Sequence, residues 1–230
     1  MIRLVAFDTS TRWCGVALLE GQAAGEAPRV VAETGRLVSG SQAGEIMQLL
    51  DELVSEAGWS RTAIDAYAAT HGPGSFTGVR VGLGTVRGLA LASGRPAFGV
   101  GTLVSMAEAI GPVGLDRVPL LDAGRGEVFG ARFDPRVSPP VEKIAPWIGA
   151  PESSLEPAGG AAVLFGPGAQ LHAARLREAG YDGPFPAAPL PVAAGAGRLA
   201  LLRLAAAAPD GEGLAPVYLR PTDAERKLRS

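Results

Sequence analysis

Hydrophobic and polar positions along the chain alternate first with a period of two and then with a period near 3.6. Apolar residues from Ile2 to Ala6 and from Cys14 to Leu18 predict two strands that are joined by the polar turn at 8–11. A third apolar run at 30–32 extends this pair into an antiparallel meander. In the segment Ser41 to Ala57, apolar residues recur three and four positions apart, with acidic residues on the other face, which predicts an amphipathic helix.

The most unusual stretch runs from Thr70 to Gly94 and combines a turn with a glycine-rich helix. A short apolar strand ends before Gly72-Pro73-Gly74, and either Ser75 or Thr77 is placed to cap the helix that follows. Four glycines lie inside the helical pattern, and each costs roughly 1 kcal/mol relative to alanine. Close packing against bare backbone must therefore compensate for about 3–4 kcal/mol.

The glycines of this helix form two rows with a spacing of four residues. One row is Gly74, Gly78 and Gly82, and the other is Gly84, Gly88 and Ala92. Each row is compatible either with packing against the chain's own sheet or with a helix–helix interface to a second chain. The apolar stripe of the amphipathic helix allows the same two interpretations. The candidate interface residues are Ile46, Met47, Leu50, Leu53, Gly78, Gly82, Gly84 and Gly88.

A glycine-rich turn before a helix is also typical of phosphate-binding sites, because free backbone N–H groups and the helix dipole favour an anion there. The Walker spacing and the GxGxxG pattern are both absent, and Arg80 is the nearest cation. Candidate residues for binding phosphate or nucleotide lie in this turn and in two acidic hairpin turns. They are Asp8, Thr9, Ser10, Gly72, Gly74, Ser75 and Asp122.

The second half of the chain repeats the first in outline. An apolar run at 118–121 leads into the acidic turn at 122–125 and then into a second strand pattern. A later apolar run at 161–165 enters Gly166-Pro167-Gly168 and a helical pattern, as the first glycine turn does. The sequence predicts a duplicated α/β fold with two mixed sheets, divided into an N-terminal domain at 1–111 and a smaller C-terminal domain at 112–230.

Other parts of the second half give weaker patterns. We expect the proline-rich segment 135–157 to be mostly loop, with an edge strand near Val141. An Ala/Leu helix is expected from Leu199 to Ala208, an extended segment at 215–220, and a loose charged end from Asp223 to Ser230.

Composition narrows the classes of function. The chain has 230 residues, 47% of them hydrophobic, and a formal net charge of −2, so no overall basic field attracts nucleic acid. No apolar run approaches the length of a membrane span, and we expect a cytoplasmic protein. The single cysteine, Cys14, excludes an internal disulfide and is expected to be a buried apolar residue.

The hairpins with acidic turns resemble the fold shared by actin, sugar kinases and heat-shock ATPases, in which such turns hold nucleotide phosphates. More narrowly, the sequence resembles the TsaB family, also called YeaZ, of threonylcarbamoyladenosine biosynthesis. The matching motifs span nearly the whole chain: Phe7-Asp8-Thr9-Ser10, GPGSFTGVR at 72–80, Leu121-Asp122-Ala123 with Glu127-Val128, and Pro216-Val217-Tyr218-Leu219-Arg220. Relatives often begin the first helix with His-Ser, whereas this chain has Ser39-Gly40-Ser41-Gln42.

The resemblance implies a non-catalytic subunit that supports threonylcarbamoyl transfer to the adenosine beside the tRNA anticodon. The implied partners are TsaD, which carries the catalytic metal site, and the ATPase component TsaE, with a homodimer also possible. The chain would meet tRNA only through the complex and would have no cofactor of its own, with ATP or ADP present only within the complex. TsaD has a His-x-x-x-His pair where this chain has Thr102 and Met106, so no bound metal and no catalytic residue are expected.

Two enzymatic alternatives remain. Asp8, Ser10, Ser75 and Asp122 are compatible with the nucleotide site of a small-molecule kinase of the same fold. A glycoprotease-like peptidase would need a base beside Ser10 or Ser75, and neither of the two histidines of the chain, His71 and His172, has a sequence context that indicates one.

Overall fold

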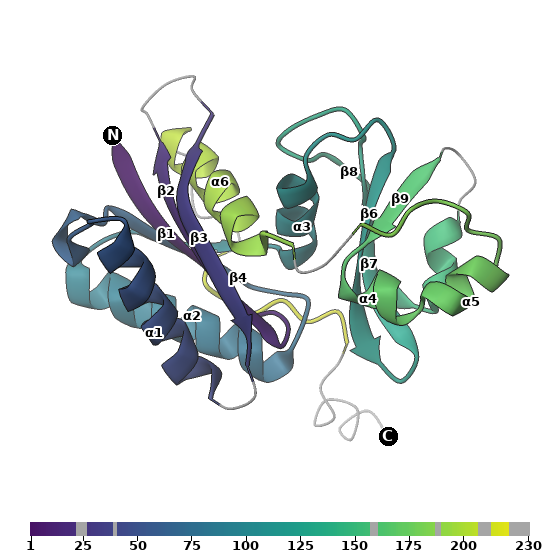
Figure 1. Ribbon diagram of the computed structural model, residues 1–230, viewed down its shortest axis with the longest axis horizontal. Coiled ribbons are helices and arrows are strands. Elements are labelled where there is room, and N and C mark those ends of the chain that lie inside the picture. Colours follow the sequence, from purple (N-terminus) through teal and green to yellow (C-terminus); the bar gives the residue numbers. More distant parts are fainter. Residues whose placement is uncertain (22–26, 39–40, 157–160, 187–189, 207–212, 221–230) are drawn as a thin grey trace.

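Two mixed β-sheets, one in each half of the chain, form the framework of the protein (Figure 1). The computed structural model describes residues 1–21, 27–38, 41–156, 161–186, 190–206 and 213–220. The predicted end segment 223–230 lies outside these residues. The duplicated α/β architecture with two mixed sheets, predicted from the matched hairpins and turns, is confirmed.

The first sheet has five strands in the order β3-β2-β1-β4-β5. They are β1 (Ile2–Asp8), β2 (Trp13–Gly21), β3 (Arg29–Leu37), β4 (Ala66–Thr70) and β5 (Ala97–Val100). The first three strands pair antiparallel as the predicted meander, and β4 and β5 add parallel pairs beside β1. Parallel addition is possible because helices make the crossover connections between these strands.

Alternate residues of the first sheet face different helices, because successive side chains of a strand point to opposite sides. Val5 and Phe7 of β1 pack with α1 (Gln42–Glu56) and α2 (Phe76–Ser93). Leu4 and Ala6 pack on the other side with α6 (Val192–Ala205). A short 3-10 helix, Arg61–Ala63, leads from α1 toward β4. The sheet is therefore covered by helices on both faces.

The second sheet has four strands in the order β8-β7-β6-β9. They are β6 (Asp116–Gly124), β7 (Glu127–Phe133), β8 (Glu142–Gly149) and β9 (Ala162–Phe165), followed by the short helices α4 (Pro167–Leu171) and α5 (Ala173–Glu178). The sequence pattern predicts one helix after Gly166-Pro167-Gly168. This prediction is wrong, because the helix is interrupted at His172, which separates α4 from α5.

The proline-rich segment at 135–157 is more regular than its sequence indicates. Strand β8 occupies eight residues at the edge of the second sheet, and the 3-10 helix Pro151–Leu155 follows it. Pro146 lies inside β8 without disrupting the sheet, since proline has no N–H to donate and an edge strand tolerates this on the side that has no neighbouring strand. The prediction of an edge strand was right, but the prediction that the segment is mostly loop was wrong.

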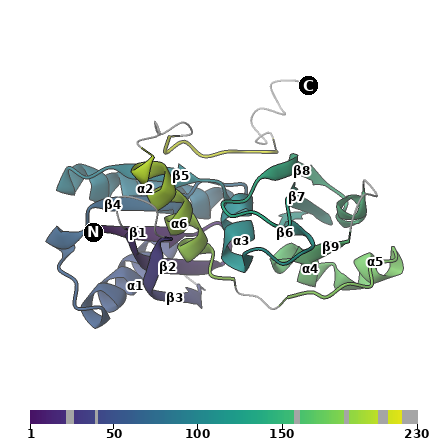
Figure 2. The same cartoon turned by 90° about the horizontal axis from the view of Figure 1, so that it is seen from above.

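Helix α6 lies in the second half of the sequence but packs on the first sheet, and α3 (Thr102–Ile110) lies beside it between the two sheets (Figures 1 and 2). The helix begins at Val192, earlier than the predicted Leu199. A Cβ on Gly195 would lie 2.1 Å from the Ser105 carbonyl oxygen, and one on Gly197 would lie 2.2 Å from a methyl group of Leu19. The division of the chain into domains at 1–111 and 112–230 stays a prediction. It would place α6 in the C-terminal domain, whereas α6 packs on the first sheet.

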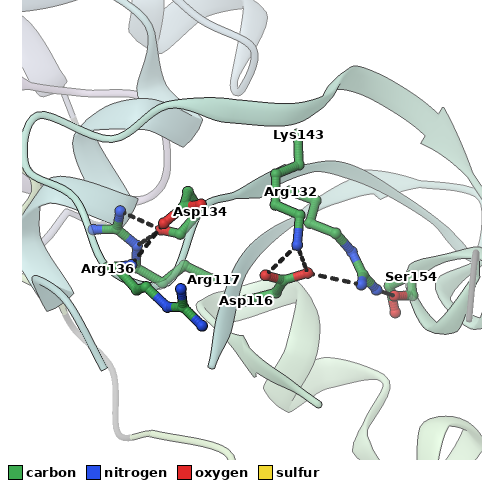
Figure 3. A network of polar contacts seen from close by, with 7 residues as sticks. All are labelled: Asp116, Arg117, Arg132, Asp134, Arg136, Lys143 and Ser154. Carbon is green, nitrogen blue, oxygen red and sulfur yellow. Dashed lines mark hydrogen bonds and ion pairs between the residues drawn. The ribbon is translucent and has the colours of Figure 1, made fainter. Parts of the chain in front are cut away.

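Charged side chains are buried where β6 meets the rest of the second half (Figure 3). Arg117 is 0% exposed and donates to the carbonyl oxygens of Asp134, Ala107 and Val137, at 2.6–3.1 Å. Since Ala107 belongs to α3, this guanidinium ties α3 to the second sheet.

A second buried group on the same strand fixes the edge of this sheet. Asp116 accepts from Arg132 at 3.2 Å and from Lys143 at 2.7 and 2.8 Å, and Arg132 also donates to the Ser154 carbonyl oxygen at 3.1 Å (Figure 3). The buried Asp116 carboxylate is therefore paired with two cations, which offsets the cost of removing it from water, and we assign the cluster a structural role.

Candidate functional site

The turn between β1 and β2 is buried and is held by its own acid. Asp8 is 3% exposed and accepts from the Thr70 hydroxyl at 2.7 Å and from the Ser10 backbone N–H at 3.1 Å. Burial raises the pKa of Asp8, because desolvation outweighs these two hydrogen bonds. The predicted acid at this turn therefore stabilises the turn itself.

The first glycine row of α2 is the surface on which this turn packs. A Cβ on Gly74 would lie 2.4 Å from the Ser10 carbonyl oxygen, and a Cβ on Gly78 would lie 2.0 Å from the Thr9 carbonyl oxygen. A Cβ on Gly82 would lie 2.4 Å from the Thr9 hydroxyl, which donates to the Gly78 carbonyl at 2.7 Å. The placement of Gly78 and Gly82 in a partner interface is therefore wrong, because both glycines face the chain's own hairpin.

Backbone groups of the glycine turn are also engaged within the chain. The Ser75 N–H donates to the Ser10 carbonyl at 2.6 Å, and the Ser75 hydroxyl caps α2 by accepting from Gly78 N–H at 3.1 Å. Gly72 has φ +112°, and its missing side chain leaves room for the Val217 carbonyl, which a Cβ would approach to 2.5 Å. The chain thus contacts this turn from both sides, at positions where a phosphate would need open N–H groups.

The second acidic turn does not complete a nucleotide site. Asp122 is exposed and accepts from the Gly124 N–H at 2.8 Å within its own hairpin. A cavity of about 30 Å³ lies between the halves, and among the described residues Asp8 and Ser10 line it but Asp122 does not. The remaining lining is mainly apolar: Thr11, Trp13, Met106, Leu121, Pro167, Leu190 and Val192. This volume holds about two water molecules, so the residues present do not fit a nucleotide there.

A larger groove of about 420 Å³ opens on the outer side of the same turn. Its lining comes from the first hairpin and from the starts of α1 and α2: Arg12, Val38, Ser41, Gln42, Ala43, Ser75, Thr77 and Val81. Gln42 donates to the Thr11 carbonyl at 2.9 Å and so fixes the hairpin against α1. Sequence reasoning found Ser75 but missed the groove, because nothing in the sequence pairs Arg12 with the start of α1.

The apolar stripe of α1 faces inward. Ile46, Leu50 and Leu53 are at most 3% exposed and belong to the core beneath α1 and α2, against which Met47 also packs. The assignment of Ile46, Leu50 and Leu53 to a partner interface is therefore wrong, and the alternative, that the helix covers its own sheet, describes them. Met47 is only partly buried, and its candidate role stays a prediction.

The second glycine row of α2 faces outward. Gly84 and Gly88 are exposed, and a Cβ on either would meet no atom within 4 Å. Leu91, near the end of the same face, is 88% exposed. Of the predicted interface residues, Gly84 and Gly88 are the ones that present bare backbone at the surface.

The positions that carry histidines in TsaD are buried in this chain. Thr102 is 0% exposed at the start of α3, and Met106 is 1% exposed in the core shared with the second sheet. Across the described ranges, no three His, Cys, Asp or Glu side chains gather in a metal-binding group. Nor, in that part of the chain, does any helix have the length and apolar character that a bilayer span requires.

The geometry above defines a duplicated α/β protein of the actin-like class, with a small cavity between its two halves. Component A of (R)-2-hydroxyglutaryl-CoA dehydratase from Acidaminococcus fermentans shares this fold, with a TM-score of 0.56 at 13% identity over 90% of this chain and 100% of that chain. An uncharacterised Pseudomonas aeruginosa protein with similarity to peptidase YeaZ has a TM-score of 0.75 at 30% identity, covering 96% of this chain and 100% of that chain. YeaZ from the same organism has 0.74 at 29%, covering 95% and 100%.

Sequence comparisons give the same relationship. The chain is 37% identical over 134 residues to the tRNA threonylcarbamoyladenosine biosynthesis protein TsaB of Escherichia coli (strain K12), covering 57% of this chain and 55% of that protein. TsaB of Haemophilus influenzae is 38% identical over 108 residues, covering 47% and 43%. The chain belongs to the TsaB family, also called YeaZ. The family model of TsaD, tRNA N6-adenosine threonylcarbamoyltransferase, matches residues 36–148. The chain spans about half the length of the curated relatives it matches.

Proposed function

We propose that this chain is a non-catalytic subunit of the bacterial complex that transfers threonylcarbamoyl to the adenosine beside the tRNA anticodon. The observation that carries the proposal is the 37% identity to a curated protein named for the biosynthesis of that nucleoside. The chain would assemble with a TsaD-like catalytic subunit, and the match to the TsaD family over 36–148 supports a common architecture of the two subunits.

A supporting rather than catalytic role fits the chemistry of the described residues. Thr102 and Met106 replace the imidazoles that a metal would need, and both are buried. The exposed Ser75 hydroxyl of the glycine turn caps α2. These features favour neither the kinase nor the peptidase alternative.

The outward glycine row of α2 is our proposed contact for the TsaD-like partner or for a second copy of the chain. Helix axes approach to about 8–10 Å, and small residues at the contact allow the near end of that range. Gly84, Gly88 and Ala92 provide such a strip, and the exposed Leu91 provides an apolar side chain to bury.

In this proposal, nucleotide binds to the other subunits of the complex and not to this chain. The small cavity between the halves supports the absence of a cofactor intrinsic to this chain. An ATPase component such as TsaE would supply ATP turnover, tRNA would be reached through the assembled complex, and the complex would work in the cytoplasm.

Depletion of the protein followed by mass analysis of tRNA nucleosides tests the proposal. We expect threonylcarbamoyladenosine to fall and to recover when the wild-type chain is expressed again. An unchanged level would show that the proposed function is wrong. ATP turnover by the purified chain without partners would instead support the kinase alternative.

The contact surface has its own test. Gly84→Leu and Gly88→Leu place a side chain on the outward row, so sedimentation should show weaker association with the TsaD-like partner or with a second copy. Thermal melts should show a monomer that remains folded, because no atom lies within 4 Å of the new Cβ. Wild-type association of both variants would exclude this row as the contact.

A further inference from the structure

Three side chains at the start of α2 form an exposed cluster that the proposed partner contact does not use. Phe76 and Tyr218 are 44% and 37% exposed, and their ring centroids are 5.1 Å apart. The Arg80 guanidinium carbon lies 3.6 Å from the centroid of the Phe76 ring and 5.5 Å from that of Tyr218. We call Phe76, Arg80 and Tyr218 the aromatic–arginine surface. It lies one to two turns before the outward glycine row.

The segment that carries Tyr218 is fixed in place at several points. Residues 213–220 pass along α2 toward the second sheet (Figure 2). Val217 N–H donates to the His71 carbonyl at 2.8 Å, Arg87 donates to the Leu214 carbonyl at 2.9 Å, and Arg220 pairs with Glu127. The two rings are therefore held in position before any ligand arrives, which lowers the entropy that binding would cost.

The two segments that carry this surface contain only basic charged residues, and the Glu127 carboxylate beside the end of segment 213–220 is paired with Arg220. Neither α2 nor the segment 213–220 contains an acidic residue, whereas Arg80 and Arg87 are both exposed on α2. The neighbouring row of α2, with Thr77 and Val81, lines the open groove that also contains the exposed Arg12. A ligand that covers this region meets aromatic faces, a guanidinium and further positive charge on a protein whose net charge is −2.

We propose that the aromatic–arginine surface binds an unpaired RNA base by stacking, with the adjoining groove and Arg12 beside the sugar–phosphate backbone. Single-stranded RNA is recognised by bases that stack on aromatic rings and on arginine guanidinium planes, and flanking cations attract its phosphates. The inference rests on the proposed function, in which tRNA is the RNA that the complex presents. It adds a direct contact to a chain otherwise expected to meet tRNA through its partners.

A protein partner on this surface is the competing explanation. It is less favoured because Arg80 stacks on Phe76 and so brings a charge onto the ring face that a protein partner would bury, whereas every nucleic acid base has a face that can stack on a ring or a guanidinium plane. The outward glycine row, further along α2, already provides the smooth strip that a partner helix needs.

The test measures fluorescence anisotropy of a labelled RNA stem-loop with an unpaired loop, using the full chain alone and assembled with the TsaD-like subunit. A fully paired RNA duplex of equal charge is the second probe. Arg80→Lys keeps the charge but removes the planar group, and Tyr218→Ala removes one ring. Tyr218→Phe restores the ring. Arg95→Gln is the charge control, because Arg95 lies past the end of α2 and has its nearest acid, Asp65, at 3.7 Å.

We expect Arg80→Lys and Tyr218→Ala to weaken stem-loop binding about 10-fold, a change that corresponds to about 1.4 kcal/mol and to one base–aromatic stack. Tyr218→Phe and Arg95→Gln should stay within about twofold of wild type, and the duplex should bind more weakly than the stem-loop. Thermal melts of every variant separate loss of binding from loss of folding.

Three results would each overturn the inference. They are no stem-loop binding by the chain or the complex, equal losses for Arg95→Gln and Arg80→Lys, or loss of subunit assembly in place of RNA affinity for Arg80→Lys and Tyr218→Ala. The proposed function fails separately, when depletion leaves threonylcarbamoyladenosine unchanged. Stem-loop binding is measured on the protein itself, so the two failures are distinguishable.

Discussion

Alanine substitutions in the two glycine rows of α2 should have opposite effects on stability. At Gly84 a Cβ meets no atom within 4 Å, so Gly84→Ala should stabilise the protein by the helix-propensity difference of about 0.8–1 kcal/mol. At Gly78 the same gain is opposed by a Cβ that would lie 2.0 Å from the Thr9 carbonyl oxygen, a backbone atom that cannot rotate away. The hairpin turn must therefore move.

The size of the second effect follows from what that movement breaks. Overpacking in a tight interior costs about 1–3 kcal/mol, and each of the two hydrogen bonds at this joint contributes about 1 kcal/mol. These bonds join the Thr9 hydroxyl to the Gly78 carbonyl and the Ser75 N–H to the Ser10 carbonyl. After the propensity gain, Gly78→Ala should be less stable than wild type by about 2–4 kcal/mol, and less stable than Gly84→Ala by about 3–5 kcal/mol.

Urea unfolding followed by circular dichroism, at a protein concentration low enough to avoid association, measures both variants. A double-mutant cycle adds a stricter control, because a Cβ on Gly82 would overlap the Thr9 hydroxyl at 2.4 Å. Gly82→Ala should destabilise the wild-type background and be tolerated in Thr9→Ala, where that oxygen is gone. Equal unfolding midpoints for Gly78→Ala and Gly84→Ala would refute the assignment of the inner row to the hairpin.

Three further predictions concern buried groups. Burial raises the pKa of the Cys14 thiol to about 11, so a thiol reagent at pH 8 should label the native protein far more slowly than the urea-unfolded chain, and fast native labelling would contradict this. Burial also raises the pKa of the Asp8 carboxyl above its ordinary value, so the folded state holds this proton more tightly than the unfolded chain does, and stability should fall as the pH rises from that ordinary value through the raised pKa. Asp8→Asn should flatten this fall in urea midpoints measured across pH, and parallel curves would count against it. Arg117→Met leaves buried carbonyl oxygens without donors and should lower the free energy of unfolding by about 3 kcal/mol. Lys143→Ala, at a partly exposed position, should lower it by at most about 1 kcal/mol. Similar melting temperatures for the two variants would show that Arg117 does not hold α3 against the second sheet.

Much of the fold was predictable because its signals are local. The antiparallel meander, the helix from Ser41 and the strand–turn–helix around Gly72 each depend on residues close together in the sequence. The start of α6 was missed because its first turns are rich in Ala and Gly, and the reason for the glycines lies in distant partners such as Ser105 and Leu19.

The candidate site was less predictable, because the decisive question was which side of a helix faces which neighbour. Both glycine rows fit the same periodicity, and only the position of Thr9 shows that Gly78 faces inward while Gly84 faces outward. The stripe containing Ile46 was assigned to a partner interface for the same reason, since an apolar stripe does not say whether it covers its own sheet or another chain.

The contact between the hairpin and the glycine turn also explains why the Ser75 N–H is not available to bind an anion in this fold. An anion bound to the Ser75 N–H itself would have to break the hydrogen bond from that N–H to the Ser10 carbonyl oxygen and displace a buried turn held by the Asp8 hydrogen bonds. Displacement would open the packing of Thr9 on Gly78 at the same time, because the same few residues make both contacts. Binding an anion to that N–H would therefore disrupt the contact between the hairpin and the glycine turn that positions α2. It would also disturb the outward surfaces of α2 that we assign to a partner and to RNA.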